Sequence, residues 1–330
     1  MKKYSVGKRI AGTVLIPGGT FLVFVILCAM QGNAFIASQG HVQLLFRSIA
    51  TVSLTSYALS LNLNSGRFDF SLGSIALLSS VVSSSLAIAN DWGPAMMLLV
   101  SVIMGLILGA ISGLLYVLLK LPAIITSLGV TLMYEALAYI YTDGKGVSFG
   151  TIKKLTAMSS NVVFMIAVIV IGIIVMTVLF DHSQFGYRYR ALKNGQKVAV
   201  NTGIKEVPNA IVCYVIAGGL MGVQGYISGC VSGTIQMALN FGTIGVMFTA
   251  FLPMFIGGFI GRFINEHIGM VLGAATSAFI SLGFVRLGLS TEVQSLVSAL
   301  VLVIFLIYLN NEYKILSFFT KQKAEKKGEE

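Results

Sequence analysis

Apolar residues are gathered in long runs along the chain, and short polar connections separate these runs. A run of about 18 or more apolar residues is long enough to cross the hydrocarbon core of a bilayer as a helix. Helices are expected because they satisfy their own backbone hydrogen bonds, which lipid cannot do. The runs occupy residues 14–31, 42–63, 70–89, 95–118, 122–142, 162–180, 209–231, 244–261, 267–285 and 293–310. The pattern predicts an all-α fold, a polytopic transmembrane helical bundle of about ten spans.

The composition agrees with this pattern. Of the 330 residues, 56% are hydrophobic and 10% are charged, and the mean hydropathy is +0.89. An ordinary soluble domain carries about 25% charged residues. Clusters of Gly, Pro or Ser in the first, third and fourth runs predict kinks or breaks there. Cys28, Cys213 and Cys230 lie in apolar runs without metal-ligand spacing, so we expect buried free thiols and no metal site.

Basic residues are concentrated in every second connection. If both chain ends lie on one side, that side holds 17 of the 22 Lys and Arg residues, and the positive-inside rule makes it cytoplasmic. The net charge of +10 then reflects membrane topology at an anionic leaflet, so no nucleic-acid partner is expected. The expected parts are a basic cytoplasmic N-terminus (1–13), a transmembrane domain (14–310) and a charged cytoplasmic tail (311–330) in the plasma membrane.

Glycine recurs at intervals of four residues in two places. The repeated positions are Gly105, Gly109 and Gly113, then Gly225, Gly229 and Gly233, with Gly218 and Gly222 on a similar stripe. Small residues at this spacing let helix backbones approach closely in lipid. These close helix contacts either serve packing alone or also slide during gating. The glycine spacing is compatible with both interpretations.

The motifs of several enzyme classes are missing from the sequence. There is no G-x-x-x-x-G-K-[ST] loop for ATP phosphates, and no HExxH, CxxC or GxSxG motif. His41, His182 and His267 are far apart in sequence and lie at the edges of the apolar runs. We therefore expect no catalytic residue, no cofactor and no ATPase site in this chain.

Three charged residues lie inside or beside the apolar runs. Arg47 and Glu135 fall within runs, and Asp69 falls at the edge of one. A charge in lipid is costly, so such residues usually face the protein interior or a water-filled cavity. They are either structural charges at helix ends and in ion pairs, or polar lining for a solute pathway.

The longest polar connection, residues 181–208, is predicted to be cytoplasmic. Within it, Val198 to Asn201 can form a short helix that ends at Gly203. A short helix with one apolar face either lies on the membrane surface or docks in a groove of a partner protein.

The same connection carries a family resemblance. Its residues 186–204, GYRYRALKNGQKVAVNTGI, resemble a cytoplasmic segment of ribose-type ABC importer permeases, which reads close to GRYIYAIGGNPEAARLSGI. The matching residues are Gly186, Ala191, Ala199, Gly203 and Ile204. Residues 67–75 (RFDFSLGSI), 121–129 (LPAIITSLG) and 255–261 (FIGGFIG) resemble three further family segments in the same order. The resemblance covers nearly the whole chain and points to the branched-chain amino acid/ribose permease superfamily.

The resemblance implies an importer for a sugar or similar small polar solute in the bacterial inner membrane. Two permease chains, identical or not, would form the pathway in membrane lipid, two cytoplasmic ATPase subunits would drive it, and an extracytoplasmic binding protein would deliver the solute. The expected ATPase-coupling residues are Ala191, Lys193, Gly195, Lys197, Ala199, Gly203 and Ile204.

The chain departs from the family pattern in places. Glu135-Ala136 stands where the family often has Arg-Gly, and Gln196-Lys197 stands where it has Pro-Glu. The coupling surface is thus more basic, which implies a more acidic ATPase groove. Other solutes, nucleosides among them, are handled by related permeases and remain open.

Two functions from other classes also remain open. A self-sufficient ion- or proton-coupled carrier would depend on intramembrane carboxylates, of which Glu135 is the first to consider. An intramembrane enzyme would bring catalytic polar residues together in one cavity.

Overall fold

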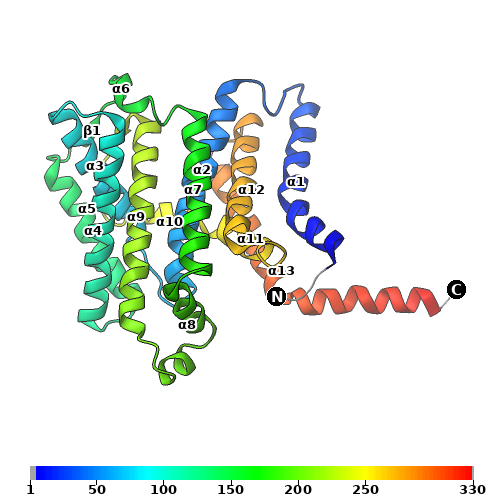
Figure 1. The fold of residues 1–330 in the computed structure, drawn as a ribbon. Helices are drawn as coiled ribbons and strands as arrows, with labels where there is room; N and C mark the ends of the chain where they lie inside the picture. The colour runs from blue at the N-terminus through cyan, green and yellow to red at the C-terminus, as the bar shows by residue number, and fades with distance from the viewer. Residues whose placement is uncertain (1–4, 329–330) are drawn as a thin grey trace.

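The computed structural model describes residues 5–328, and the side chains of residues 5–311 (Figure 1). Lys2, Lys3 and the side chains of the C-terminal tail, which the topology prediction also used, lie outside this description. The helices are α1 (Val6–Met30), α2 (Gln39–Leu63), α3 (Leu72–Ala89), α4 (Pro94–Leu119), α5 (Ala123–Tyr141), α6 (Lys153–Thr156), α7 (Val162–Asp181), α8 (Gln184–Asn201), α9 (Glu206–Ser232), α10 (Ile244–Thr249), α11 (Phe251–Ile260), α12 (Glu266–Arg286) and α13 (Thr291–Gly328). Two short strands, β1 (Val147–Ser148) and β2 (Thr234–Ile235), pair antiparallel.

The expected helical bundle is confirmed. Among the described residues, nine helices are long and apolar enough to cross a membrane, namely α1 to α5, α7, α9, α12 and residues 291–311 of α13. The remaining expected span, 244–261, consists of the short helices α10 and α11. Helix α1 begins at Val6 and α13 continues to Gly328, so helix extends on both sides of the predicted domain limits at 14 and 310.

The one broken span is not where the sequence pattern placed breaks. The first, third and fourth runs form the single helices α1, α3 and α4, of which α1 contains Pro17 and bends in its lower part (Figure 1). The break falls at Ala250, between α10 and α11, three residues before Pro253. Proline has no N–H to donate to the carbonyl of Thr249 four residues earlier, so it fits the first turn of α11 without loss of a helical hydrogen bond.

The bundle has two ends, named here by the short helices at them (Figure 1). At the α8 end, Arg9 near the start of α1 donates to the Phe263 carbonyl in the α11–α12 connection. At the α6 end, Arg286 of α12 donates to the Ala34 carbonyl between α1 and α2. The start of α1 therefore lies at the α8 end, and α13 begins near Arg286 at the α6 end and runs toward the α8 end (Figure 1).

The centre of the bundle is built on α9, which packs against α2, α3 and α4. Gly109 of α4 lies so close to α9 that an added Cβ would stand 2.4 Å from the Tyr214 carbonyl oxygen. Gly105 faces the Gly218 carbonyl in the same way, and Ser101 Oγ donates to the Gly222 carbonyl at 2.7 Å. The close approach expected from the glycine spacing is confirmed at the α4–α9 seam.

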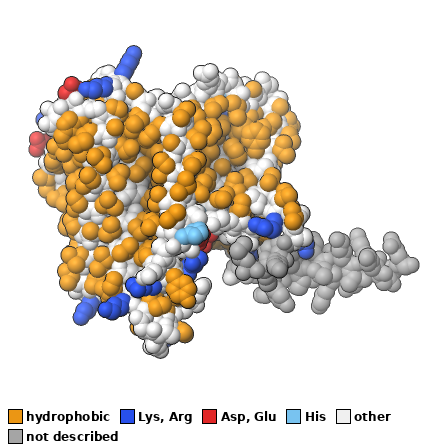
Figure 2. Space-filling view, in the orientation of Figure 1, with side chains coloured by type: hydrophobic (Ala, Val, Ile, Leu, Met, Phe, Trp, Pro, Cys, Tyr) orange, Lys and Arg blue, Asp and Glu red, His pale blue; other side chains and the backbone are white. Residues whose placement is uncertain are grey.

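The outer surface is apolar around the flanks and charged at the ends. Hydrophobic side chains cover the flank seen in Figure 2, while Lys and Arg gather at the lower, α8 end and mixed charges lie at the upper, α6 end. Helices α1 and α7 and the described part of α13 contribute much of this exposed apolar surface. This distribution is what a lipid-embedded protein requires.

Candidate functional site

Asp69 fixes the start of α3 inside the protein. Its side chain is buried, and Oδ1 accepts hydrogen bonds from Ser71 N at 3.0 Å and Ser71 Oγ at 2.6 Å. Oδ2 accepts from Asn62 Nδ2 at the end of α2, at 3.1 Å. A carboxylate at a helix N-terminus meets unpaired N–H groups and the positive end of the helix dipole. Asp69 therefore joins the end of α2 to the first turn of α3.

Glu135 does the same for α10 from a distant part of the chain. It is fully buried on α5, and its carboxylate accepts from Phe241 N at 3.0 Å, Thr243 N at 2.9 Å and Thr243 Oγ1 at 2.6 Å. All three donors belong to the segment 236–243, which has no helical or strand backbone and leads into α10. An arginine at this position would have no acceptor atoms to offer, so the three donors require the carboxylate that this chain has here.

The starts of α3 and α10 lie against one another. A Cβ added at Gly73, in the first turn of α3, would stand 2.0 Å from the carbonyl oxygen of Thr243. Only a glycine permits this approach of two backbones. Asp69 and Glu135 are thus brought to two helix starts that touch, here called the helix-start crossing (residues 69–73, 135 and 241–244).

Arg47 is not part of this crossing. It lies near the start of α2, and its Nε donates to the Ser159 carbonyl at 3.0 Å, in the connection that follows α6. Of the three charged residues that the sequence proposed for a pathway, the structure brings two together and gives the third a separate backbone contact at the α6 end.

Arg67 is a buried charge that sequence reasoning missed as a site residue. Its side chain is 4% exposed, and Nη1 lies 4.0 Å from Glu206 Oε1. Its Nε and Nη2 have no hydrogen-bond partner among the described residues. The sequence does contain a signal for this site, because Arg67 lies two positions before Asp69 and beside an apolar run.

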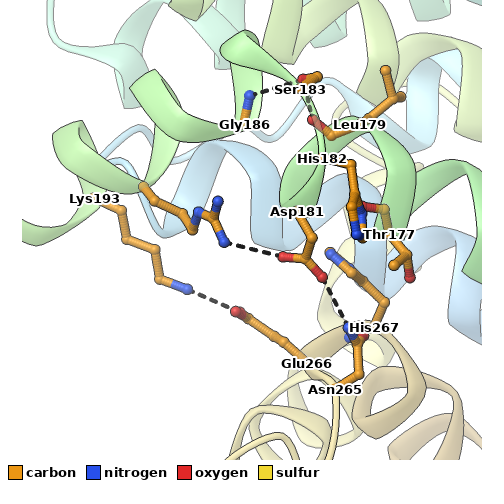
Figure 3. A network of polar contacts seen from close by, with 11 residues as sticks. Thr177, Leu179, Asp181, His182, Ser183, Gly186, Lys193, Asn265, Glu266 and His267 are labelled. Atoms are coloured by element: carbon orange, nitrogen blue, oxygen red, sulfur yellow. Dashed lines mark hydrogen bonds and ion pairs between the residues drawn. The ribbon is translucent and has the colours of Figure 1, made fainter. Parts of the chain in front are cut away.

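The first half of α8 is held against the bundle by polar contacts (Figure 3). Lys193 Nζ lies 2.8 Å from Glu266 Oε1, and Arg190 Nη1 lies 3.3 Å from Asp181 Oδ1. The other Asp181 oxygen accepts from Asn265 Nδ2 at 2.8 Å. These contacts connect α8 to the end of α7 and the start of α12.

Tyr189 adds a buried contact between α8 and α2. Its hydroxyl donates to the Ser60 carbonyl at 3.2 Å. Burial raises the pKa of the Tyr189 phenol above its ordinary value, so the hydroxyl stays protonated and keeps its donor role. Gly186 allows α8 to approach α7, since a Cβ there would collide with the Phe180 backbone.

The second half of α8 begins after Gly195, whose backbone is not helical. It ends in a Schellman motif, in which Gly203 N donates to the Val200 carbonyl at 3.0 Å and Ile204 N donates to the Ala199 carbonyl at 3.1 Å. Gly203 has φ +89°, the left-handed conformation that the motif needs. The spacing of Ala199, Gly203 and Ile204 is therefore explained by local folding.

Burial divides the expected coupling residues into two groups. Ala199 is buried against the protein's own bundle, and Ala191, Lys193, Gly195 and Ile204 are half-buried. Lys197 and Gly203 are exposed. Two exposed apolar residues that were left out of the expected set, Val198 (69% exposed) and Val200 (43%), lie beside Lys197.

A cavity of about 620 Å³ lies at the α8 end. Its lining includes Lys193 of α8, Glu266 of α12, and Met254, Phe255 and Phe259 of α11. Helices α10 and α11 therefore connect the helix-start crossing to this cavity.

Comparisons with known proteins agree with this architecture. Residues 42–306 match the family model described as branched-chain amino acid transport system / permease component. The autoinducer 2 import system permease protein LsrC of Yersinia pseudotuberculosis is 25% identical over 73% of this chain and 74% of its own length. The same-named protein of Photorhabdus luminescens is 26% identical over 56% of this chain and 57% of its own length.

The ribose import permease protein RbsC of Bacillus subtilis is 25% identical over 63% of this chain and 67% of its own length. No solved structure matches the chain.

Proposed function

This chain belongs to the branched-chain amino acid transport system / permease component family, and we propose that it carries a sugar or similar small polar solute inward, powered by separate ATPase subunits. It is a multi-pass membrane protein, which the helical bundle and its apolar flanks show independently. Relatives named for the import of ribose and of autoinducer 2 support the direction and the class of solute. Nucleosides are the alternative class within the same proposal.

The observation that carries the proposal is the form of α8. It lies at one end of the bundle, its first half is tied to α2, α7 and α12, and its second half presents Val198, Val200 and Lys197 outward. A helical segment with exposed apolar and basic residues is suited to a groove with acidic rims on an ATPase. Gly195, Ala199, Gly203 and Ile204 shape the segment, while Lys193 ties α8 to α12 and Ala191 is half-buried beside it.

The remaining parts of the assembly belong to the same proposal and are supported by the family match. The α8 end faces the cytoplasm with both chain termini, and an extracytoplasmic binding protein delivers solute to the α6 end. A second permease chain, identical or related, and membrane lipid cover the apolar flanks. ATP is bound by the partner subunits, and the membrane is the bacterial plasma membrane.

The pathway proposal narrows to Asp69 and Glu135. Both carboxylates use their oxygens to hold helix starts, and Glu135 also shapes the irregular segment 236–243. Irregular backbone at membrane depth is tolerated where it is enclosed in protein or borders a cavity. We place the solute route along this segment and α11, with release through the cavity at the α8 end.

The test is assembly with an ATPase. The tagged chain, co-expressed with the ATPase and binding protein encoded beside it, should co-purify with the ATPase and transport solute in an ATP-dependent way. Val198→Asp should reduce ATPase recovery about tenfold or more, because a carboxylate would replace a desolvated apolar contact. Ser148→Asp, an exposed position on β1 at the other end, is the matched control and should leave recovery unchanged.

Two results would reject the proposal. One is solute transport by the purified chain alone, driven by an ion gradient and insensitive to ATP. The other is equal recovery of the ATPase with Val198→Asp and with the unmodified chain.

A further inference from the structure

One carboxylate oxygen lies between the second half of α8 and the α2–α3 connection. Glu206 Oε1, in the first turn of α9, accepts from Gln196 Nε2 at 2.6 Å. The same oxygen lies 4.0 Å from Arg67 Nη1. The first distance is a short hydrogen bond and the second is at the outer limit of an ion pair. In this arrangement the Glu206 carboxylate binds Gln196 rather than Arg67.

Arg67 has few partners besides the buried Cys213 thiol, which lies within hydrogen-bonding reach of it. Its guanidinium is buried, and Nε and Nη2 make no hydrogen bond among the described residues. Asn62 Oδ1 and Asn209 Nδ2, both buried at the adjoining ends of α2 and α9, are also without partners. A buried guanidinium is strongly favoured by a carboxylate that it can grip with two parallel N–H donors. Glu206 is the carboxylate within reach.

Arg67 is directly connected to the start of α3. Its backbone N–H donates to the Asn62 carbonyl at 2.9 Å, and Asn62 Nδ2 donates to Asp69 Oδ2 at 3.1 Å. Asp69 in turn holds Ser71 at the first turn of α3. A movement of the Arg67 side chain therefore reaches the helix-start crossing through two residues.

We propose that Arg67 is a positioning residue for energy coupling, and that Glu206 exchanges between Gln196 and Arg67 as the second half of α8 moves. When an ATPase displaces this half about Gly195, Gln196 withdraws and Glu206 closes a two-donor pair with Arg67. The new pair pulls on the α2–α3 connection and biases the helix-start crossing toward its other arrangement. Two alternative partners for one carboxylate make the equilibrium two-state. This inference rests on the proposed docking of α8 with an ATPase.

The test uses the reconstituted complex of the full chain with its ATPase and binding protein. Gln196→Ala removes the partner that holds Glu206 in the present arrangement, and Gln196 is exposed, so folding should be unaffected. We expect the rate of ATP hydrolysis in the absence of solute to rise by about 2- to 10-fold. This is the population shift expected when one of two states loses one hydrogen bond. In an Arg67→Gln background the same Gln196→Ala change should have no further effect, because the second partner is gone.

Arg67→Lys is the second variant, since it keeps the buried charge but lacks the parallel donors of the guanidinium. It should insert normally, bind the ATPase normally, and lower the solute transported per ATP hydrolysed. Lys154→Gln, which breaks the exposed Lys154–Asp91 pair at the α6 end, is the control and should leave that ratio unchanged.

The outcomes separate this inference from the proposed function. The inference would be overturned if the Gln196 and Arg67 changes had independent, additive effects on ATP hydrolysis in a complex that assembles and transports. The proposed function would be unaffected by that result. Unchanged hydrolysis with Gln196→Ala would also overturn it. Failure of the unmodified chain to assemble with the ATPase would reject both.

Discussion

The buried acidic side chains Asp69 and Glu135 accept hydrogen bonds from backbone N–H groups and from polar side chains. Asp69 and Glu135 each accept several hydrogen bonds at the start of a helix, and no Lys or Arg among the described residues forms an ion pair with either. Such charge-assisted bonds compensate the loss of water around a buried carboxylate. The structural interpretation of these two residues therefore accounts for their burial without a role in proton coupling.

Glu135→Ala should destabilise the protein, because it leaves Phe241 N, Thr243 N and Thr243 Oγ1 without their acceptor. The cost is about 1–3 kcal/mol for each buried donor left unpaired. Thermal unfolding in detergent, followed by size-exclusion chromatography, measures the effect. Glu292→Gln, at an exposed position in α13, is the control and should not shift the midpoint.

The Glu135 variants also separate two functions. With an ATP-driven permease, Glu135→Gln should keep transport independent of the proton gradient, at reduced stability. A transport defect that appears only under a proton gradient, with unchanged stability, would instead favour a proton-coupled carrier.

At the scale of elements, close backbone contacts decide how the helices pack. Gly105 and Gly109 of α4 meet Gly218 and Tyr214 of α9 with no room for a side chain. In lipid, where apolar burial gives helices little reason to associate, such contacts supply packing and specificity. The crossing of α3 and α10 at Gly73 follows the same rule.

Gly109→Ala should lower stability by about 1–3 kcal/mol, because the new methyl group overlaps the Tyr214 carbonyl and forces α4 and α9 apart. Gly129→Ala on α5 is the matched control, since a Cβ there meets nothing within 4 Å. It should be neutral or stabilising, as alanine favours helix. Unfolding midpoints of the two variants measured side by side decide the point, and equal shifts would contradict the packing account.

At the scale of the whole molecule, the two ends differ in charge and in architecture. The α8 end carries most basic residues of the described connections, and the α6 end carries the two-stranded sheet and the Lys154–Asp91 pair. The proposed cytoplasmic position of the α8 end rests on this charge difference through the positive-inside rule.

Single cysteines test this orientation. The native Cys28, Cys213 and Cys230 are buried and should not react with a membrane-impermeant maleimide. Lys145→Cys, exposed at the α6 end, should be labelled from outside intact cells, whereas Lys197→Cys on α8 should be labelled only after permeabilisation. The reverse pattern would invert the topology and with it the proposed site of ATPase docking.

The order of hydrophobic and polar residues alone determined the helical bundle and the approximate positions of its spans, because run length acts locally along the chain. The same holds for the end of α8, where the spacing of Ala199, Gly203 and Ile204 encodes a helix stop. Only the tertiary structure decided the partners of the buried charges. It paired Glu135 with residues 241 and 243, more than 100 positions away, separated Arg47 from Asp69, and left Arg67 beside a carboxylate already bound to Gln196. Such contacts depend on which helices pack against each other, and residue spacing along the sequence does not specify which helices these are.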